Sequence, residues 1–205
     1  MITKDRILIE ALNLFSIKGY SAVSVQDIAS SVGIKAPSLY KHYKSKQDIF
    51  DAILVEMKKS YDQQVTLLQM DGKDATNDID VFYNISEDLL IKMGKELFLY
   101  FLHDDYVCKF RKMLTIEQFR NPELSLLYSS IYFDDPLRYQ SHLFMMIDKK
   151  GHIKKVNTKI MALQFYAPLY TLLTLCDRQP EREDEVLEMV EQHIKQFYQL
   201  SQADQ

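Results

Sequence analysis

The sequence predicts an all-α protein: an N-terminal three-helix bundle with a helix–turn–helix, then a larger helical part, about nine helices in all. Glycine and proline, which interrupt helices, number only 5 each among 205 residues. Leu, Lys, Glu and Gln, which favour helix, are plentiful. Apolar residues recur at helical spacing along most of the chain. A hydrophobic content of 47% is sufficient for a packed core.

The first predicted helix begins at Thr3, its cap, and ends at Gly19. Its buried face follows helical spacing and consists of Leu8, Ala11, Leu12 and Phe15. We expect this helix to brace the next two, with Tyr20 packed under the turn that follows it.

Residues 24–46 predict two short helices joined by a tight turn. Ser24 and Asp27 have the spacing of a capping box at a helix start. Gly33 tolerates positive φ and ends the first of the two helices. Pro37 falls in the first turn of the second helix, where its missing N–H costs little. This pattern is typical of a helix–turn–helix.

The second helix of such a unit enters the major groove of DNA, and its exposed residues suit that task. Small side chains allow close approach to bases, while Lys, Ser, Tyr and His contact phosphates. We predict base contacts from Lys35, Ala36, Pro37 and Ser38. We predict phosphate contacts from Ser24, Gln26, Tyr40, Lys41, His42 and Lys46. The alternative is a surface helical hairpin that carries its lysines by chance.

Five motifs in this region carry a family resemblance. They are Ala11-x-x-Leu14-Phe15-x-x-x-Gly19-Tyr20, Ser24-Val25-x-Asp27-Ile28-Ala29, Val32-Gly33-Ile34, Ser38-Leu39-Tyr40-x-His42-Tyr43 and Ser45-Lys46-x-x-Ile49-Phe50. Together they resemble the N-terminal signature of the tetracycline-repressor (TetR) family of bacterial transcription regulators. The family more often has threonine, phenylalanine and glutamate at the positions of Ser24, Tyr43 and Asp48, so these departures bear on operator preference. The resemblance covers about the first quarter of the chain.

The resemblance implies a DNA-binding domain at 1–46 and a helical effector-binding and dimerisation domain at 47–205. It further implies a homodimer that binds a near-palindromic double-stranded operator, acts as a ligand-responsive repressor, and is released by a small apolar or aromatic effector. One alternative is an activator, or a regulator without a small-molecule effector. A small helical enzyme is a remote alternative.

Charge is unevenly distributed along the chain. The net charge is −4, yet residues 1–46 hold seven Lys/Arg and three Asp/Glu, a net of +4, which leaves −8 for the remainder. A basic N-terminal part focuses positive potential where DNA contacts are predicted. Cys108 and Cys176 indicate a reduced, cytoplasmic protein. We expect no signal peptide, because the N-terminal segment is amphipathic and contains Asp5 and Glu10. We expect no membrane partner, because no apolar run reaches roughly 18 residues.

The rest of the chain reads as further helices around one loop. Ser45 and Asp48 predict a cap for a long helix over 46–68, which in the family transmits ligand binding to the DNA-binding part. The polar segment 71–80 is predicted as a loop. Residues 86–102 are apolar all round and predict a core helix buried on several sides.

Beyond the core helix, four more helical segments follow. Asn121-Pro122 predicts a cap and helix start before an apolar segment over 124–133. Asp134-Asp135-Pro136 predicts the restart of a helix that Gly151 closes. Two final helices, over 157–176 and 180–200, form an αα-hairpin where the TetR family forms its dimer. The alternative is that both pack only on their own chain.

Ten aromatic and methionine residues are candidates for an effector site, since adaptable Met and flat rings line such sites. They are Met93, Phe98, Phe101, Phe110, Met113, Phe119, Tyr128, Tyr132, Phe165 and Tyr166. Glu96, Glu117, Gln118 and Gln164 would orient the ligand or face water. An ordinary core is the alternative. Given the resemblance, we predict the dimer interface at Leu163, Ala167, Tyr170, Thr174, Val186, Met189, Val190, His193, Ile194 and Phe197.

Catalytic, metal and cofactor sites are not expected. The sequence His103-Asp104-Asp105 predicts a solvated helix cap more than a metal site. His142, His152 and His193 are isolated and are predicted at the surface or an interface. No nucleophile–base pair, glycine-rich phosphate loop or HExxH-type motif occurs, so we expect no enzyme.

Overall fold

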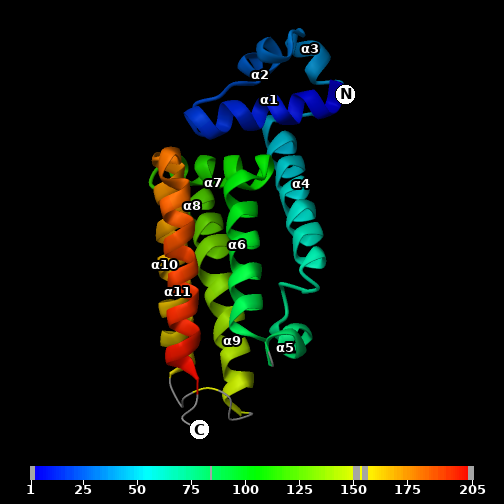
Figure 1. Ribbon diagram of the computed structural model, residues 1–205. Coiled ribbons are helices and arrows are strands. Elements are labelled where there is room, and N and C mark those ends of the chain that lie inside the picture. Colours follow the sequence, from blue (N-terminus) through cyan, green and yellow to red (C-terminus); the bar gives the residue numbers. More distant parts are fainter. Residues whose placement is uncertain (1–2, 84, 150–152, 154–156, 203–205) are drawn as a thin grey trace. The chain divides into compact units, whose positions relative to one another are not determined.

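The computed structural model describes residues 3–83, 85–149, 153 and 157–202, and within these the chain is helical (Figure 1). The elements are α1 (Thr3–Lys18), α2 (Val25–Val32), α3 (Ala36–Leu39), α4 (Lys46–Leu67), α5 (Ala75–Tyr83), α6 (Glu87–His103), α7 (Asp105–Glu117), α8 (Pro122–Ser129), a π-helix η1 (Ser130–Asp134), α9 (Asp135–Lys149), α10 (Thr158–Arg178), a 3₁₀-helix η2 (Pro180–Arg182) and α11 (Glu183–Ser201). The all-α prediction is confirmed. The predicted positions Gly151 and His152 lie outside the described residues.

The chain divides into two compact units, each built from two segments. Unit 1 comprises Met1–Tyr61 and Asp104–Ser130, and unit 2 comprises Asp62–His103 and Ile131–Gln205. Unit 1 thus holds α1, α2, α3 and most of α4 together with α7 and α8. The division at 46/47 predicted from the sequence is a division by function, and it stays a prediction.

The core of unit 1 forms where α1 packs on α2 and α7. The predicted buried face of α1 is confirmed, because Leu8, Ala11, Leu12 and Phe15 are all buried. An aromatic series then links the elements of this unit. Ring centroids lie 5.2 Å apart from Phe15 to Tyr20, 5.3 Å from Tyr20 to Phe50 and 5.6 Å from Phe50 to Phe110. The series runs from α1 through the following turn and α4 to α7.

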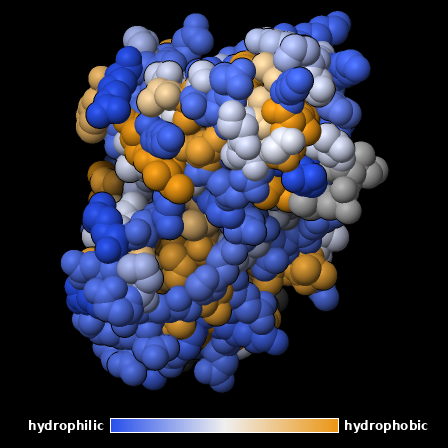
Figure 2. Space-filling model, turned by 90° about the horizontal axis from the view of Figure 1, so that it is seen from above, coloured by the Kyte–Doolittle hydropathy of each residue, from blue (hydrophilic) through white to orange (hydrophobic). Residues whose placement is uncertain are grey.

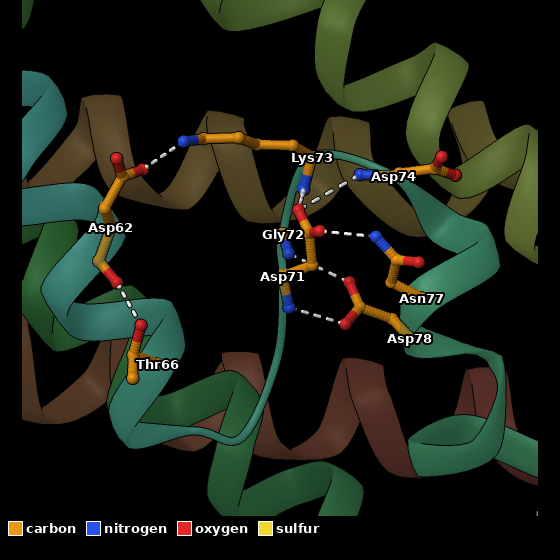
Figure 3. A network of polar contacts seen from close by, with 8 residues as sticks. All are labelled: Asp62, Thr66, Asp71, Gly72, Lys73, Asp74, Asn77 and Asp78. Carbon is orange, nitrogen blue, oxygen red and sulfur yellow. Dashed lines mark hydrogen bonds and ion pairs between the residues drawn. The ribbon is translucent and has the colours of Figure 1, made fainter.

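The predicted loop over 71–80 is wrong in its second half, because α5 begins at Ala75. Asp78 is buried and organises the segment (Figure 3). Its carboxylate accepts the N–H groups of Asp71 at 2.6 Å and Gly72 at 2.9 Å, and also the hydroxyl of Tyr139. A buried carboxylate needs such donors. The polar residues therefore cap and begin a helix.

Helix α6 is buried on fewer sides than predicted. Met93, Phe98 and Leu102 are buried, whereas Leu89 is 45% exposed. Gly94 lets α11 approach closely, since a Cβ on it would lie 2.4 Å from Cδ1 of Ile194.

The four long helices of unit 2, α6, α9, α10 and α11, run side by side (Figure 1). One core cluster joins α6, α10 and α11 and contains Phe98, Leu102, Leu172, Leu173, Cys176, Val186, Val190 and Ile194. A second cluster joins α5, α9 and α10 and contains Ala75, Leu143, Ile147, Ile153 and Met161. The predicted hairpin of the last two helices is confirmed as α10 and α11.

The sequence predicted a break before the helix that restarts at Asp134-Asp135-Pro136, but the structure shows no such break. The backbone continues from α8 into α9 through the π-helix η1. A π-turn alters the pattern of backbone hydrogen bonds, and the carbonyl of Tyr132 accepts the hydroxyl of Tyr166 at 2.7 Å. The rings of Tyr132, Phe133 and Tyr166 each contact Tyr170 on α10.

Helix α10 is long and apolar enough, by length and composition alone, to cross a membrane. Only 28% of its most apolar 18-residue stretch is buried. The expectation that no continuous apolar run reaches roughly 18 residues is not contradicted, because Lys159, Gln164 and Pro168 interrupt the apolar residues of α10. Helices of soluble proteins pass the same test, so this property is weak evidence for a membrane span.

Candidate nucleic-acid interface

Helix α2 begins with the predicted capping box. Ser24 has extended backbone angles, and its Oγ accepts the N–H of Asp27 at 3.1 Å. The Asp27 carboxylate in turn accepts the N–H of Ser24 at 2.8 Å. The hydrogen bond from the Ser24 hydroxyl is the main cause of the lowered pKa of Asp27. The box therefore fixes the start of α2 through two reciprocal bonds.

The turn between α2 and α3 also matches the prediction. Gly33 is left-handed at φ 77°, and its N–H bonds the end of α2. Arg6 on α1 donates from Nη2 to the carbonyl of Val32 at 2.9 Å, so α1 holds the same helix end. Pro37 lies in the first turn of α3. Helix α3 has 4 residues, and a further turn follows with the His42 N–H donating to Leu39 at 2.9 Å.

Most of the predicted DNA contacts are exposed. Those that are exposed are Ser24, Gln26, Lys35, Pro37, Tyr40, Lys41 and His42, and those that are half-buried are Ala36, Ser38 and Lys46. The inward residues Leu39 and Tyr43 are buried, as predicted. The surface seen in Figure 2 is largely hydrophilic, with apolar side chains in separate groups. The roles of these residues toward DNA stay predictions.

Lys46 has partners within unit 1. Its Nζ donates to the carbonyls of Tyr20 and Val23, each at 2.9 Å, and lies 4.2 Å from the centre of the Tyr20 ring. Partial burial lowers the pKa of Lys46, and the charge of Glu117 opposes that shift. Two of its three hydrogens are thus used, which favours a structural role over the predicted phosphate contact.

Tyr43 is buried shortly after α3, the predicted recognition helix, and the Nζ of Lys4 lies 5.5 Å from the centre of its ring. Its hydroxyl is buried and has no hydrogen-bond partner among the described residues. Burial is the main reason that the pKa of Tyr43 rises to about 12, with the charge of Asp5 second.

Glu117 is the residue of this unit whose role the sequence missed. The sequence left it either orienting a ligand or facing water, but it is fully buried at the end of α7. Its carboxylate accepts the N–H of Ser21 at 2.8 Å and the Ser21 hydroxyl at 2.7 Å. No signal in the sequence joins two residues 96 positions apart. An acid within an apolar helical stripe is the available hint.

The predicted effector residues are divided between the two units. Met93, Phe98, Phe101, Tyr132, Phe165 and Tyr166 belong to unit 2, whereas Phe110, Met113, Phe119 and Tyr128 belong to unit 1. Phe98, Phe101 and Phe165 pack in the α6–α10–α11 cluster. Phe119 is 92% exposed and therefore lines no interior site. Of the polar candidates, Glu96 and Gln164 are exposed, and Gln118 donates to the Thr115 carbonyl.

The predicted dimer residues fall into two groups. Val186, Val190 and Ile194 are fully buried in the core of their own unit, so α11 presents this stripe to its own chain. Leu163 and Met189 are 47% and 46% exposed, and the remaining members are half-buried: Ala167, Tyr170, Thr174, His193 and Phe197. His193 bonds the carbonyl of Phe165 at 2.8 Å, between α11 and α10. An interface would therefore be formed by the exposed group.

The His103-Asp104-Asp105 segment forms helix-end contacts. Asp104 caps α7, accepting the N–H groups of Tyr106 and Val107 at 3.0 Å each, and it also accepts the Ser60 hydroxyl at 2.7 Å. His103 pairs with Glu183 at 2.8 Å. Among the described residues, no three His, Cys, Asp or Glu side chains gather as metal ligands would.

The fold and the exposed face of α2 and α3 define a helix–turn–helix protein. Residues 7–53 match the family model described as bacterial regulatory proteins, tetR family. This N-terminal region belongs to the TetR family of bacterial regulatory proteins.

A relative is similar over part of the chain, and solved structures share its fold. The chain is 38% identical over 80 residues to the biofilm operon icaADBC HTH-type negative transcriptional regulator IcaR of Staphylococcus aureus (strain Newman). That match covers 39% of this chain and 41% of the relative, so it spans about two fifths of the relative's length. A TetR-family regulator from Mesorhizobium loti superimposes with a TM-score of 0.68 at 16% identity, covering 98% of this chain and 97% of its own. A transcriptional regulator from Saccharomonospora viridis in complex with choline superimposes with a TM-score of 0.65 at 22% identity, covering 98% of both chains.

Proposed function

We propose that the protein is a homodimeric transcriptional repressor in the cytoplasm, which binds a near-palindromic operator and is released by a small apolar or aromatic effector. The observation that carries the proposal is the helix–turn–helix itself. A capped α2, a left-handed Gly33 and an N-terminal Pro37 present Lys35 and Lys41 to solvent. That arrangement suits insertion of α3 into a major groove.

Repression is supported by the named function of the relative. IcaR is a negative transcriptional regulator, and the matched stretch of 80 residues is longer than the helix–turn–helix alone. A repressor needs only to occupy its operator, so a DNA-binding unit and a second unit that alters its affinity suffice. We accordingly favour repression over activation.

Dimerisation is supported by the face of α10 that its own chain leaves uncovered. Ile160 and Leu163 are 50% and 47% exposed on a helix of high mean hydropathy. A second copy of the same face would cover these side chains and remove them from water. Two DNA-binding units on a two-fold axis would place their recognition helices ~34–36 Å apart, or a multiple of this spacing.

Effector response is supported by the aromatic composition of unit 2 and by the choline bound to the Saccharomonospora viridis protein. To release the operator, the effector must have a higher affinity for the conformation that cannot bind DNA than for the DNA-binding conformation. At ~1.4 kcal/mol per tenfold, a hundredfold release of the operator needs roughly 3 kcal/mol of coupling between the two sites.

Selection of bound sequences from random double-stranded DNA tests the proposal. The expected product is a symmetric sequence with two half-sites, and compounds that dissociate the purified complex are then sought among apolar and aromatic molecules. Recovery of no enriched sequence at low ionic strength would refute DNA recognition. An operator that activates a reporter when the protein occupies it would favour the activator alternative.

A further inference from the structure

The turn between α1 and α2 is held by side chains from two other helices. Glu117 of α7 accepts the N–H and the hydroxyl of Ser21, at 2.8 and 2.7 Å. Lys46 of α4 donates to the carbonyls of Tyr20 and Val23, each at 2.9 Å. We name these two sets of bonds the turn clamp. A carboxylate on α7 and an ammonium group on α4 thus both form hydrogen bonds to this turn.

The environment of Glu117 makes its part of the clamp specific. Its side chain is fully buried, and a buried carboxylate is costly unless its oxygens receive hydrogen bonds. Each oxygen receives one from Ser21. Gly19 makes room, because a Cβ there would lie 2.5 Å from Oε1 of Glu117, and its φ of +85° also favours glycine. The carboxylate therefore fits only against this turn conformation.

The clamp sets the position at which the helix–turn–helix begins. Val23, whose carbonyl Lys46 holds, directly precedes Ser24, the N-cap of α2. The capping box and the Gly33 turn then pass this position on to α3. A displaced Ser21 would consequently move the recognition helix as well.

We propose that Glu117 is a positioning residue for operator binding: through Ser21 it ties the helix–turn–helix to α7, so that the placement of α7 governs DNA affinity. This inference rests on the proposed DNA-binding function. Glu117 touches no DNA in this scheme and acts only through the turn.

Charge alone predicts the opposite effect, which makes the inference testable. Removing a negative charge from a DNA-binding unit raises its attraction for phosphate. Loss of positioning lowers the affinity for the operator instead. Non-specific binding depends mainly on charge, so it should not fall.

The experiment compares Glu117→Gln and Ser21→Ala with the control Glu123→Gln. Glu123 is an exposed acid on α8 of the same unit. Affinity is measured for the selected operator and for unrelated duplex DNA. Glu117→Gln should weaken operator binding about tenfold, or ~1.4 kcal/mol, because DNA binding must then restore the turn position that the carboxylate held. Ser21→Ala should weaken it about threefold, since its backbone N–H still donates.

Further outcomes decide the inference. Glu117→Gln should leave non-specific affinity equal or slightly raised, and Glu123→Gln should leave operator affinity equal or slightly raised. Operator affinity of Glu117→Gln equal to or above that of the wild type would overturn the inference. If Glu117→Gln does not fold, as judged by circular dichroism, Ser21→Ala decides by the same criteria.

A readout without DNA separates this inference from the proposed function. Amide hydrogen exchange at residues 19–23 should accelerate in Glu117→Gln and Ser21→Ala and stay unaltered in Glu123→Gln. Equal exchange in all proteins would overturn the clamp. Should the wild type bind no duplex, the proposed function fails, whereas the exchange result still judges the clamp.

Discussion

Replacing Lys41 with alanine should make operator affinity less sensitive to salt. Lys41 is exposed and follows α3, where a phosphate contact is predicted. One contact per chain gives two per dimer, and each contributes about 0.9 to the slope of log affinity against log salt. The slope should therefore flatten by about 1.8. Over a fourfold rise in salt, from about 50 to 200 mM, the wild type should lose about twelvefold more affinity than the variant.

Fluorescence anisotropy of a labelled operator, titrated at five or more salt concentrations, measures this slope. Lys58→Ala is the matched control, because Lys58 is an exposed lysine of unit 1 that lies in the second half of α4. The control should reproduce the wild-type slope. A Lys41→Ala slope equal to that of the wild type would refute the phosphate contact, and an equal flattening in both variants would show that total charge, rather than position, matters.

Three more predictions follow from the partners of individual residues. Lys46→Met should lower the unfolding free energy, measured with urea, by about 2 kcal/mol because two partly solvated charge-assisted hydrogen bonds are lost; a flattened salt slope would restore its phosphate role. The pKa of Tyr43 is about 12 in the fold and 10.0 ordinarily, so as pH rises the unfolded chain loses this proton first and stability falls between those values by at most about 2.7 kcal/mol. In urea titrations across alkaline pH, Tyr43→Phe should abolish this part of the fall in unfolding free energy, and at pH 7 it should be neutral or stabilising. An unfolding free energy that falls in the variant as much as in the wild type would contradict this. Leu163→Glu should yield monomers by sedimentation, whereas Val190→Ala should stay dimeric and lose about 2 kcal/mol of stability; a dimeric Leu163→Glu protein would exclude this face of α10 as the interface.

Local features of the fold could be predicted because their causes lie within a few residues. The reciprocal bonds of Ser24 and Asp27 span three positions, and Gly33 ends α2 through its own φ. The buried face of α1 follows from helical periodicity alone. These features lie in the part of the chain that matches the family model.

Features that depend on distant partners could not be predicted. An apolar stripe on α11 shows that one face is covered, but not by which chain, and Val190 and Ile194 turn out to be buried in their own unit. The polar composition of segment 71–80 predicts a loop, whereas in the folded chain the buried Asp78 accepts two N–H groups of this segment. Glu117 finds Ser21 only in the folded chain.

The central claim is that two copies of this chain bind one symmetric stretch of duplex DNA. Sedimentation equilibrium of the purified protein with the selected operator at low ionic strength measures this stoichiometry directly. The account predicts two chains for each duplex, with half-site centres separated by about 10 base pairs or a multiple of one helical turn. A single chain on each duplex, or no complex at any concentration tried, would contradict it.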